Sequence, residues 1–315
     1  MADTKETPTV VHTTSGSLFT PEQTSELFNK VNGHSALAKL SAQKPIPFAG
    51  TDTFVFSMDG EASIVAEGGN KPAGNAAFDK VTFKPLKFVY QHRITDEFMN
   101  MADDKQIPYL QAFLDGFAKK MARALDIAAM HGIDPASKTT STAIGSNCLD
   151  SAVPTASAIA GTANPAADLQ SAVDAVQLLD CEVTGMAMSP KFASSMGKLK
   201  QTSTSNVVLY PEFAFGSRPD SFNGMNVDVN NTVSYNASTT ADAVNPEVYI
   251  GDFQNAFRWG YADGIKTEII EYGDPDGQGD LKYSNQVVIR AEAYIGWGFL
   301  NKNAFAKITS KVARS

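Results

Sequence analysis

The segment with the strongest helical periodicity, residues 109–131, most limits how this chain can fold. Its polar face carries Gln111, Asp115, Lys119, Arg123 and Asp126. Pro108 fits the first turn, and Gly132 supplies the stop. At about 1.5 Å per residue the helix is a rod of roughly 35 Å, so strands and loops must pack around it. The apolar face repeats every three or four residues and consists of Leu110, Phe113, Leu114, Phe117, Met121, Leu125 and Ala128.

Composition favours a soluble, acidic protein of a reducing compartment such as the cytosol. With 43% hydrophobic residues, a chain of 315 residues can bury a substantial core, as one large domain or two intertwined domains. The two cysteines, Cys148 and Cys181, are not spaced as a zinc site or a disulfide framework. No apolar run approaches the length of about 18 residues that a membrane span needs, and the polar first residues predict no signal peptide. The net charge of −8 disfavours sequence-specific DNA binding, which usually needs a basic face.

Residues 53–94 change to strand-forming character. TFVFSM (53–58), ASIVAE (62–67) and the long stretch 78–94 are rich in valine, isoleucine, phenylalanine and threonine. The turn-forming run GGNKPAGNAA (68–77) predicts the tip of a hairpin. Two strands alone bury too little apolar surface to be stable, and the chain offers no evident partner surface. The hairpin therefore gives the first indication of assembly.

The rest of the chain alternates short helices with strands. Residues 1–17 predict a mobile arm, and 21–40 predict one or two short helices. A second helix is expected at 168–180, and a third begins at Pro190 with Ser189 as its N-cap. Strands are expected in MNVDVNN, PEVYIGD, the two long stretches on either side of GDPDGQGD (273–280), and AFAKIT near the C-terminus. This mixture predicts an α+β fold.

Two patterns that could indicate metal chemistry have simpler interpretations. The four histidines, His12, His34, His92 and His131, are far apart and lack metal-ligand spacing. GDPDGQGD resembles the opening of a calcium loop, but the position that should supply a bidentate glutamate is Asn285. A turn is the better interpretation. No nucleotide-binding or nucleophile-elbow motif is present, so we expect no enzyme, no cofactor and no metal site.

Four stretches, in the same order and at similar separations, resemble the major capsid proteins of tailed bacteriophages with the Hong Kong 97 type fold. The resemblance covers roughly residues 45–310. Three positions depart from the family pattern: Ser189 replaces a commoner asparagine, Asn226 replaces a proline, and Lys302 breaks the closing motif. The matching stretches are IVAEGGNKPAGNAAFDKVTFKPLKFVYQHRITDEF, the long helix 109–131, AMSPKFASSMGKLK with FNGMNVDVNNTV, and VYIGDFQNAFRWGYADGIKTEII with NQVVIRAEAYIGWGFLNKNAFAKI.

The resemblance implies a shell subunit whose hexamers and pentamers form an icosahedral capsid around double-stranded DNA, assembled in the bacterial host cytoplasm. It implies a virion component that contacts DNA only non-specifically and no membrane. Partners would be further copies of the chain, a separate scaffolding protein, a portal and decoration proteins. The implied layout is an N-terminal arm (1–45), an extended β-hairpin loop (46–90), a peripheral domain with the long spine helix (91–135 and 245–300) and an axial domain (136–244 and 301–315).

The resemblance also implies where subunits would meet. Some family members form a Lys–Asn isopeptide bond between subunits, promoted by a glutamate, and Lys71, Asn285 and Glu292 fall near those three positions. The inter-subunit contacts expected on this basis are Glu67, Lys71, Phe78, Phe83, Lys119, Arg123, Arg258 and Arg290.

Two alternatives remain at this stage. An encapsulin-like bacterial nanocompartment would use the same fold to enclose enzymes. A monomeric cytosolic enzyme would need a site assembled by tertiary contacts alone, which no residue spacing supports.

Overall fold

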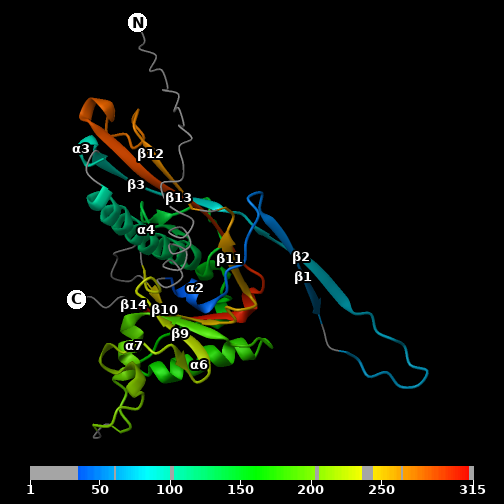
Figure 1. The fold of residues 1–315 in the computed structure, drawn as a ribbon. Coiled ribbons are helices and arrows are strands. Elements are labelled where there is room, and N and C mark those ends of the chain that lie inside the picture. The colour runs from blue at the N-terminus through cyan, green and yellow to red at the C-terminus, as the bar shows by residue number, and fades with distance from the viewer. Residues whose placement is uncertain are drawn as a thin grey trace.

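The computed structural model describes residues 35–59, 62–99, 103–202, 206–235, 244–263 and 265–311. It shows a body built from two sheets and one long helix, from which a two-stranded hairpin projects (Figure 1). The predicted mobile arm and the predicted helical residues before 35 lie outside these ranges. Within the described part of the chain, no helix combines the length and apolar character that crossing a bilayer requires.

The long helix, α4 (Asp103–His131), has 29 residues and begins six residues before the predicted start. Pro108 consequently lies in the second turn rather than the first. The helix ends as predicted, because Gly132 has a φ of +67° and its N–H bonds to the carbonyl of Ala128. The predicted apolar face is confirmed where side chains are described: Leu114, Phe117, Met121, Leu125 and Ala128 are buried.

The prediction that Asp126 lies on the exposed polar face of this helix is wrong. Its side chain is fully buried, because backbone and hydroxyl donors of two other segments surround the carboxylate.

A four-stranded sheet packs on the long helix. Its centre is β13 (Gln286–Phe299), which pairs with β3 (Leu86–Thr95) on one side and with β12 (Lys266–Ile270) and β11 (Phe257–Tyr261) on the other. All these pairs are antiparallel, so the sheet presents alternate side chains to the helix. The inward residues of β13, such as Ala291, Ala293 and Ile295, share one core cluster with α4.

A six-stranded sheet forms the second layer. Helices α6 (Pro165–Gln177) and α7 (Pro190–Gly197) pack against it, and Ser189 caps α7 as predicted by accepting a hydrogen bond from the N–H of Phe192. Asn164 caps α6, which therefore starts three residues earlier than predicted. In spatial order the strands are β6 (Ala158–Ala160), β14 (Phe305–Lys311), β10 (Val244–Gly251), β7 (Gly185–Met188), β9 (Met225–Val229) and β8 (Ser221–Phe222).

The hairpin consists of β1 (Thr51–Asp59) and β2 (Asn75–Phe83) in continuous antiparallel register. Its tip, among the described residues, is irregular from 62 to 74. The prediction of a strand at 62–67 is therefore wrong. Ile64 and Val65 have strand propensity, but they lie beyond the last paired residues and have no partner ladder to join.

Three predicted domain boundaries cut through continuous structure. Residue 90 lies inside β3, and β10 belongs to the six-stranded sheet, so neither 90/91 nor 244/245 separates two units. The third predicted boundary, the end of the arm at residue 45, is also misplaced, because residues 35–46 are part of the body. There α2 (Ala36–Leu40) packs into the core, and Lys44 and Ile46 bond to the edge of β11.

Short elements complete the described chain. They are α3 (Asp96–Met99), β4 (Ile133–Asp134), β5 (Thr139–Thr140), α5 (Leu149–Ala152), η1 (Thr155–Ser157), η2 (Pro211–Gly216), η3 (Lys282–Ser284) and η4 (Lys302–Ala304).

Candidate subunit-contact surfaces

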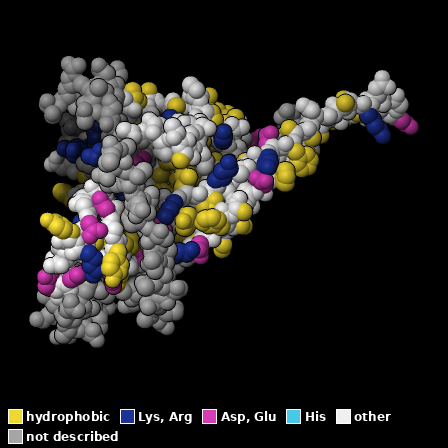
Figure 2. Space-filling model, turned by 90° about the horizontal axis from the view of Figure 1, so that it is seen from above, with side chains coloured by type: hydrophobic (Ala, Val, Ile, Leu, Met, Phe, Trp, Pro, Cys, Tyr) yellow, Lys and Arg dark blue, Asp and Glu magenta, His cyan; other side chains and the backbone are white. Residues whose placement is uncertain are grey.

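One face of the projecting hairpin is aromatic. Alternation along β1 places Phe54 and Phe56 on the same face, and the register sets Phe78 of β2 directly opposite Phe56. The rings of Phe56 and Phe78 lie 4.9 Å apart. These side chains are 67% (Phe54), 51% (Phe56) and 73% (Phe78) exposed, and Figure 2 shows hydrophobic side chains along the projection. A ribbon with three exposed phenylalanines needs another surface to cover it.

Phe83, at the base of the hairpin, is not a surface residue, so its predicted contact with a neighbouring subunit is wrong. Its ring is fully buried and packs tightly against Gly298: a Cβ added to Gly298 would lie only 2.5 Å from a carbon of the Phe83 ring. The guanidinium of Arg258 lies over the same ring at 5.6 Å and reaches the carbonyl of Pro45 at 3.4 Å. Phe83 and Arg258 thus fasten the hairpin to its own subunit.

The tip of the hairpin presents its side chains to solvent. Glu67 and Lys71 are both exposed, and Ile64 is completely exposed. The predicted role of Glu67 and Lys71 in subunit contacts stays a prediction.

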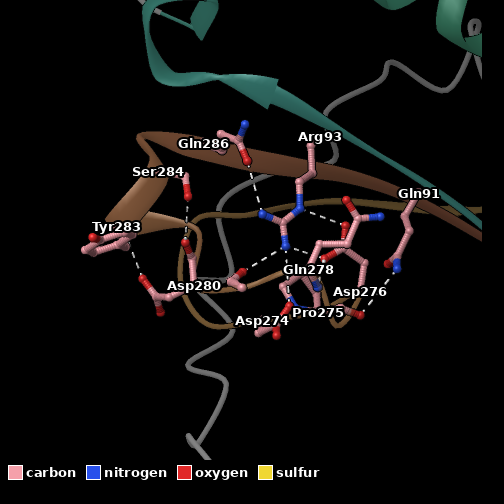
Figure 3. Close-up of polar contacts among 11 residues, drawn as sticks. Gln91, Arg93, Asp274, Pro275, Asp276, Gln278, Asp280, Tyr283, Ser284 and Gln286 are labelled. Carbon is pink, nitrogen blue, oxygen red and sulfur yellow. Dashed lines mark hydrogen bonds and ion pairs between the residues drawn. The ribbon is translucent and has the colours of Figure 1, made fainter.

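The acidic turn GDPDGQGD is held by an arginine of the same chain. Arg93 of β3 donates through Nε to Asp276 at 2.8 Å and through Nη2 to the other Asp276 oxygen, to Asp274 at 3.3 Å and to the carbonyl of Gly279 at 2.8 Å (Figure 3). Nη1 donates to Gln286 at 3.1 Å. The hydrogen bond from Arg93 lowers the pKa of Asp276 to about 2. The turn interpretation therefore holds, because a guanidinium occupies the position that the calcium interpretation assigned to an ion.

A ladder of charged side chains crosses the four-stranded sheet. Arg290 donates to Gln91 at 3.0 Å and to Glu268 at 3.2 Å, and Lys87 pairs with Glu292 at 2.7 Å. Arg290 therefore uses part of its hydrogen-bonding capacity within its own subunit. Its predicted inter-subunit contact stays a prediction and would have to use the remaining capacity of the guanidinium.

Two of the expected contact residues, Lys119 and Arg123, lie on the spine helix, and their predicted role between subunits stays a prediction. Lys119 is exposed. Arg123 donates to Asn231 at 2.8 Å and lies over the ring of Tyr235 at 5.5 Å, so it ties α4 to the loop after β9.

The crosslink residues are not gathered in one subunit. Asn285 is exposed with a φ of +51° and directly precedes β13, whereas Glu292 lies seven residues further along that strand. At about 3.3 Å per strand residue the two are roughly 23 Å apart, and Lys71 is at the far end of the hairpin. Any isopeptide site would need these residues from different subunits.

The metal-ligating side chains of the described residues are dispersed. No cluster of three or more metal-ligating side chains occurs among them. His92 is exposed, and His131 is buried against Asp150 and the carbonyl of Thr232. His12 and His34 lie outside the described ranges. An open groove of about 310 Å³ at the hairpin base has a floor of Ile144, Trp297 and Phe299 and a rim of Lys80, Lys84 and Lys302.

The arrangement of hairpin, spine helix and two sheets defines a shell-forming structural protein. The model of the family described as "Phage capsid family" matches residues 16–310. The chain therefore belongs to the phage capsid family. It is a major capsid protein, a structural component of the virion rather than an enzyme, and its copies self-assemble.

Solved structures agree over most of the chain. A structure from Mycobacterium phage Ogopogo is 29% identical, with a TM-score of 0.75 over 88% of this chain and 92% of that chain. One from Gordonia phage Cozz is 24% identical, with a TM-score of 0.69 over 89% and 86%. The capsid of a native GTA particle, computed with C5 symmetry, is 15% identical and has a TM-score of 0.59 over 97% and 95%. No match is found among the curated proteins. The Hong Kong 97 type fold is thus confirmed. The family match and the phage structures favour a phage capsid protein over the shell protein of a bacterial nanocompartment.

Proposed function

We propose that this chain assembles as hexamers and pentamers into an icosahedral shell around double-stranded DNA. The observation that carries the proposal is the hairpin, whose three phenylalanines are left exposed by the part of the subunit that the structure describes. Burying a phenylalanine contributes about 1.5–3 kcal/mol. A neighbouring subunit would supply the missing surface, and many such modest contacts would sum to a stable shell.

We further propose how the subunit divides into an arm, an extended loop, a peripheral domain and an axial domain. The arm would end before residue 35, because residues 35–46 are part of the body. The hairpin 51–83 would be the extended loop, and α4 with the four-stranded sheet would form the peripheral domain. The six-stranded sheet, including β10, with α6 and α7 would form the axial domain that surrounds the capsomer axis.

The other partners are also proposals. A separate scaffolding protein and a portal would take part in assembly, and decoration proteins would bind outside. The net charge of −8 supports weak, non-specific contact with packaged DNA, because an acidic surface repels phosphate.

Negative-stain electron microscopy of the purified full chain, with its mass from light scattering, tests the shell directly. We expect closed shells or rings of five and six subunits. A uniform monomer of 33.6 kDa that stays monomeric with its scaffolding partner would contradict the proposal.

Covalent crosslinking between Lys71 and Asn285, promoted by Glu292, is a separate prediction. If it occurs, assembled shells should give ladders on a denaturing gel, and Lys71→Ala should abolish them. Lys84→Ala is the matched control, since it removes a lysine near the hairpin base and should leave the ladders intact. Monomer alone on the gel from intact wild-type shells would exclude the crosslink.

A further inference from the structure

A buried carboxylate joins three separate segments of the body. Asp126 of α4 accepts hydrogen bonds from the hydroxyl of Ser35 at 2.5 Å and from the backbone N–H groups of Ala36 at 2.9 Å and Leu37 at 3.3 Å. The hydroxyl of Thr232 donates to it at 2.9 Å. One side chain of the spine helix thus holds both the start of α2 and the loop 230–235.

No cation accompanies these donors among the contacts of the described residues. Arg123, one turn earlier on α4, donates to Asn231 and stacks on Tyr235. Lys39 of α2 pairs with Asp220 at 2.7 Å and with Asp228 at 3.4 Å. Among the described residues, Asp126 is therefore a buried acid whose hydrogen-bond donors are all neutral, an arrangement in which its charge is costly.

His131 also binds the loop 230–235. Its Nε2 donates to the carbonyl of Thr232 at 2.9 Å, and its Nδ1 lies 2.9 Å from Asp150. Asp150 also meets the hydroxyl of Tyr249 on β10 and the ammonium of Lys307 on β14. Burial alone would raise the pKa of Asp150, but His131 and Lys307 lower it overall, so this half of the junction stays ionised. Of the two carboxyl groups at the junction, Asp126 is therefore the one whose pKa is raised.

Burial raises the pKa of Asp126 to about 6, against the lowering effect of its four hydrogen bonds. If the junction opens, water reaches the carboxyl and its pKa returns to about 3.9. Between pH 4 and pH 6, Asp126 is then mostly protonated in the closed form and mostly ionised in the open form. Closure is favoured as the pH falls from 6 toward 4, and that preference is lost as the pH rises through 6.

We propose that Asp126 makes this junction a proton-dependent clasp, which closes α2 and the loop 230–235 onto the spine helix in mild acid and loosens as the pH rises from about 4 through 6. Loop 230–235 follows β9, and Leu40 of α2 packs beside Gly185 of β7, so both segments belong to the six-stranded sheet layer. Loosening the clasp would release α2 and the loop 230–235 from the spine helix, while buried residues of the sheet such as Tyr249 stay packed in the same core as the helix. The inference concerns a single subunit and stands whether or not shells form.

Amide hydrogen exchange on the purified, unassembled full chain tests the clasp at the N–H groups of Ala36 and Leu37. After correction for the intrinsic pH dependence of exchange, their protection should fall by about fiftyfold between pH 4 and pH 7.5, the change that the two pKa values imply. Asp126→Asn keeps the shape of the side chain without its charge and should make protection independent of pH. Asp134→Asn, the control, changes a carboxylate just beyond α4 that contacts Ala136 and Ser137 instead of the junction, and it should keep the dependence.

A second variant covers the case in which Asp126→Asn does not fold. Thr232→Val removes one donor to the charged carboxylate, so the midpoint of the pH dependence should move upward. Flat protection in the wild type, an unchanged dependence in Asp126→Asn, or an unchanged midpoint in Thr232→Val would each overturn the clasp.

Discussion

Replacing Phe54, Phe56 and Phe78 together with serine is expected to abolish shell assembly while leaving the isolated subunit folded. The three side chains share the exposed face of the hairpin and contribute little to the subunit's own core. Burying three phenylalanines against a neighbour is worth on the order of 5 kcal/mol per hairpin contact. Because a shell repeats this contact at every subunit, losing it should shift the equilibrium to free subunits. Light-scattering mass and electron microscopy measure the result.

The control is Ala77→Ser, which adds a hydroxyl on the opposite face of the same ribbon and should assemble normally. The melting temperature of the unassembled triple variant should match that of the wild-type subunit. Normal shells from the triple variant would show that the aromatic face is not a subunit contact.

Gly260→Ala is expected to destabilise the subunit by about 3 kcal/mol or more. A Cβ at this position would stand 1.8 Å from the carbonyl oxygen of Lys44, which is backbone and cannot rotate away. The segment 43–46 lies along β11 through bonds from Lys44 N–H to Trp259 and from Ile46 N–H to Tyr261. The added methyl would push the segment 43–46 away from β11. The resulting overpacking strain and the weakening of these two hydrogen bonds each lower the free energy of unfolding by about 1 kcal/mol or more.

Urea unfolding of the unassembled chain measures this loss as a lower midpoint. Gly116→Ala is the matched control, because Gly116 is an exposed helical residue and the added methyl would meet no atom within 4 Å beyond its own stretch of helix. That change should raise stability by up to about 1 kcal/mol, since alanine favours the helix. Equal midpoints for Gly260→Ala and the wild type would mean that the 43–46 segment does not hold its place on β11.

Local patterns predicted those elements whose determinants are near in sequence. The apolar repeat of α4, its stop at Gly132 and the cap of α7 at Ser189 all depend on residues within a few positions of one another. Strands such as β9 and β14 were predicted from alternation or β-forming composition.

Features that depend on long-range contacts were missed. Asp126 has the spacing of a surface residue, and only the arrival of Ser35 and Thr232, 91 and 106 residues away, makes its position an interior one. In the same way, Arg93 reaches Asp276 across 183 residues, which no local motif indicates. The aromatic face of the hairpin is likewise not evident from the sequence, because it requires the register that pairs Phe56 with Phe78.

The hairpin and the central sheet are linked through one short stretch of chain. β2 ends at Phe83, and β3 begins at Leu86 and runs beside β13 for ten paired residues. A pull on the hairpin along β3 would therefore load the whole β3–β13 ladder in shear, with its hydrogen bonds sharing the force instead of breaking one at a time. Force applied to the hairpin would therefore enter the body through ten paired residues at once, at the centre of the four-stranded sheet.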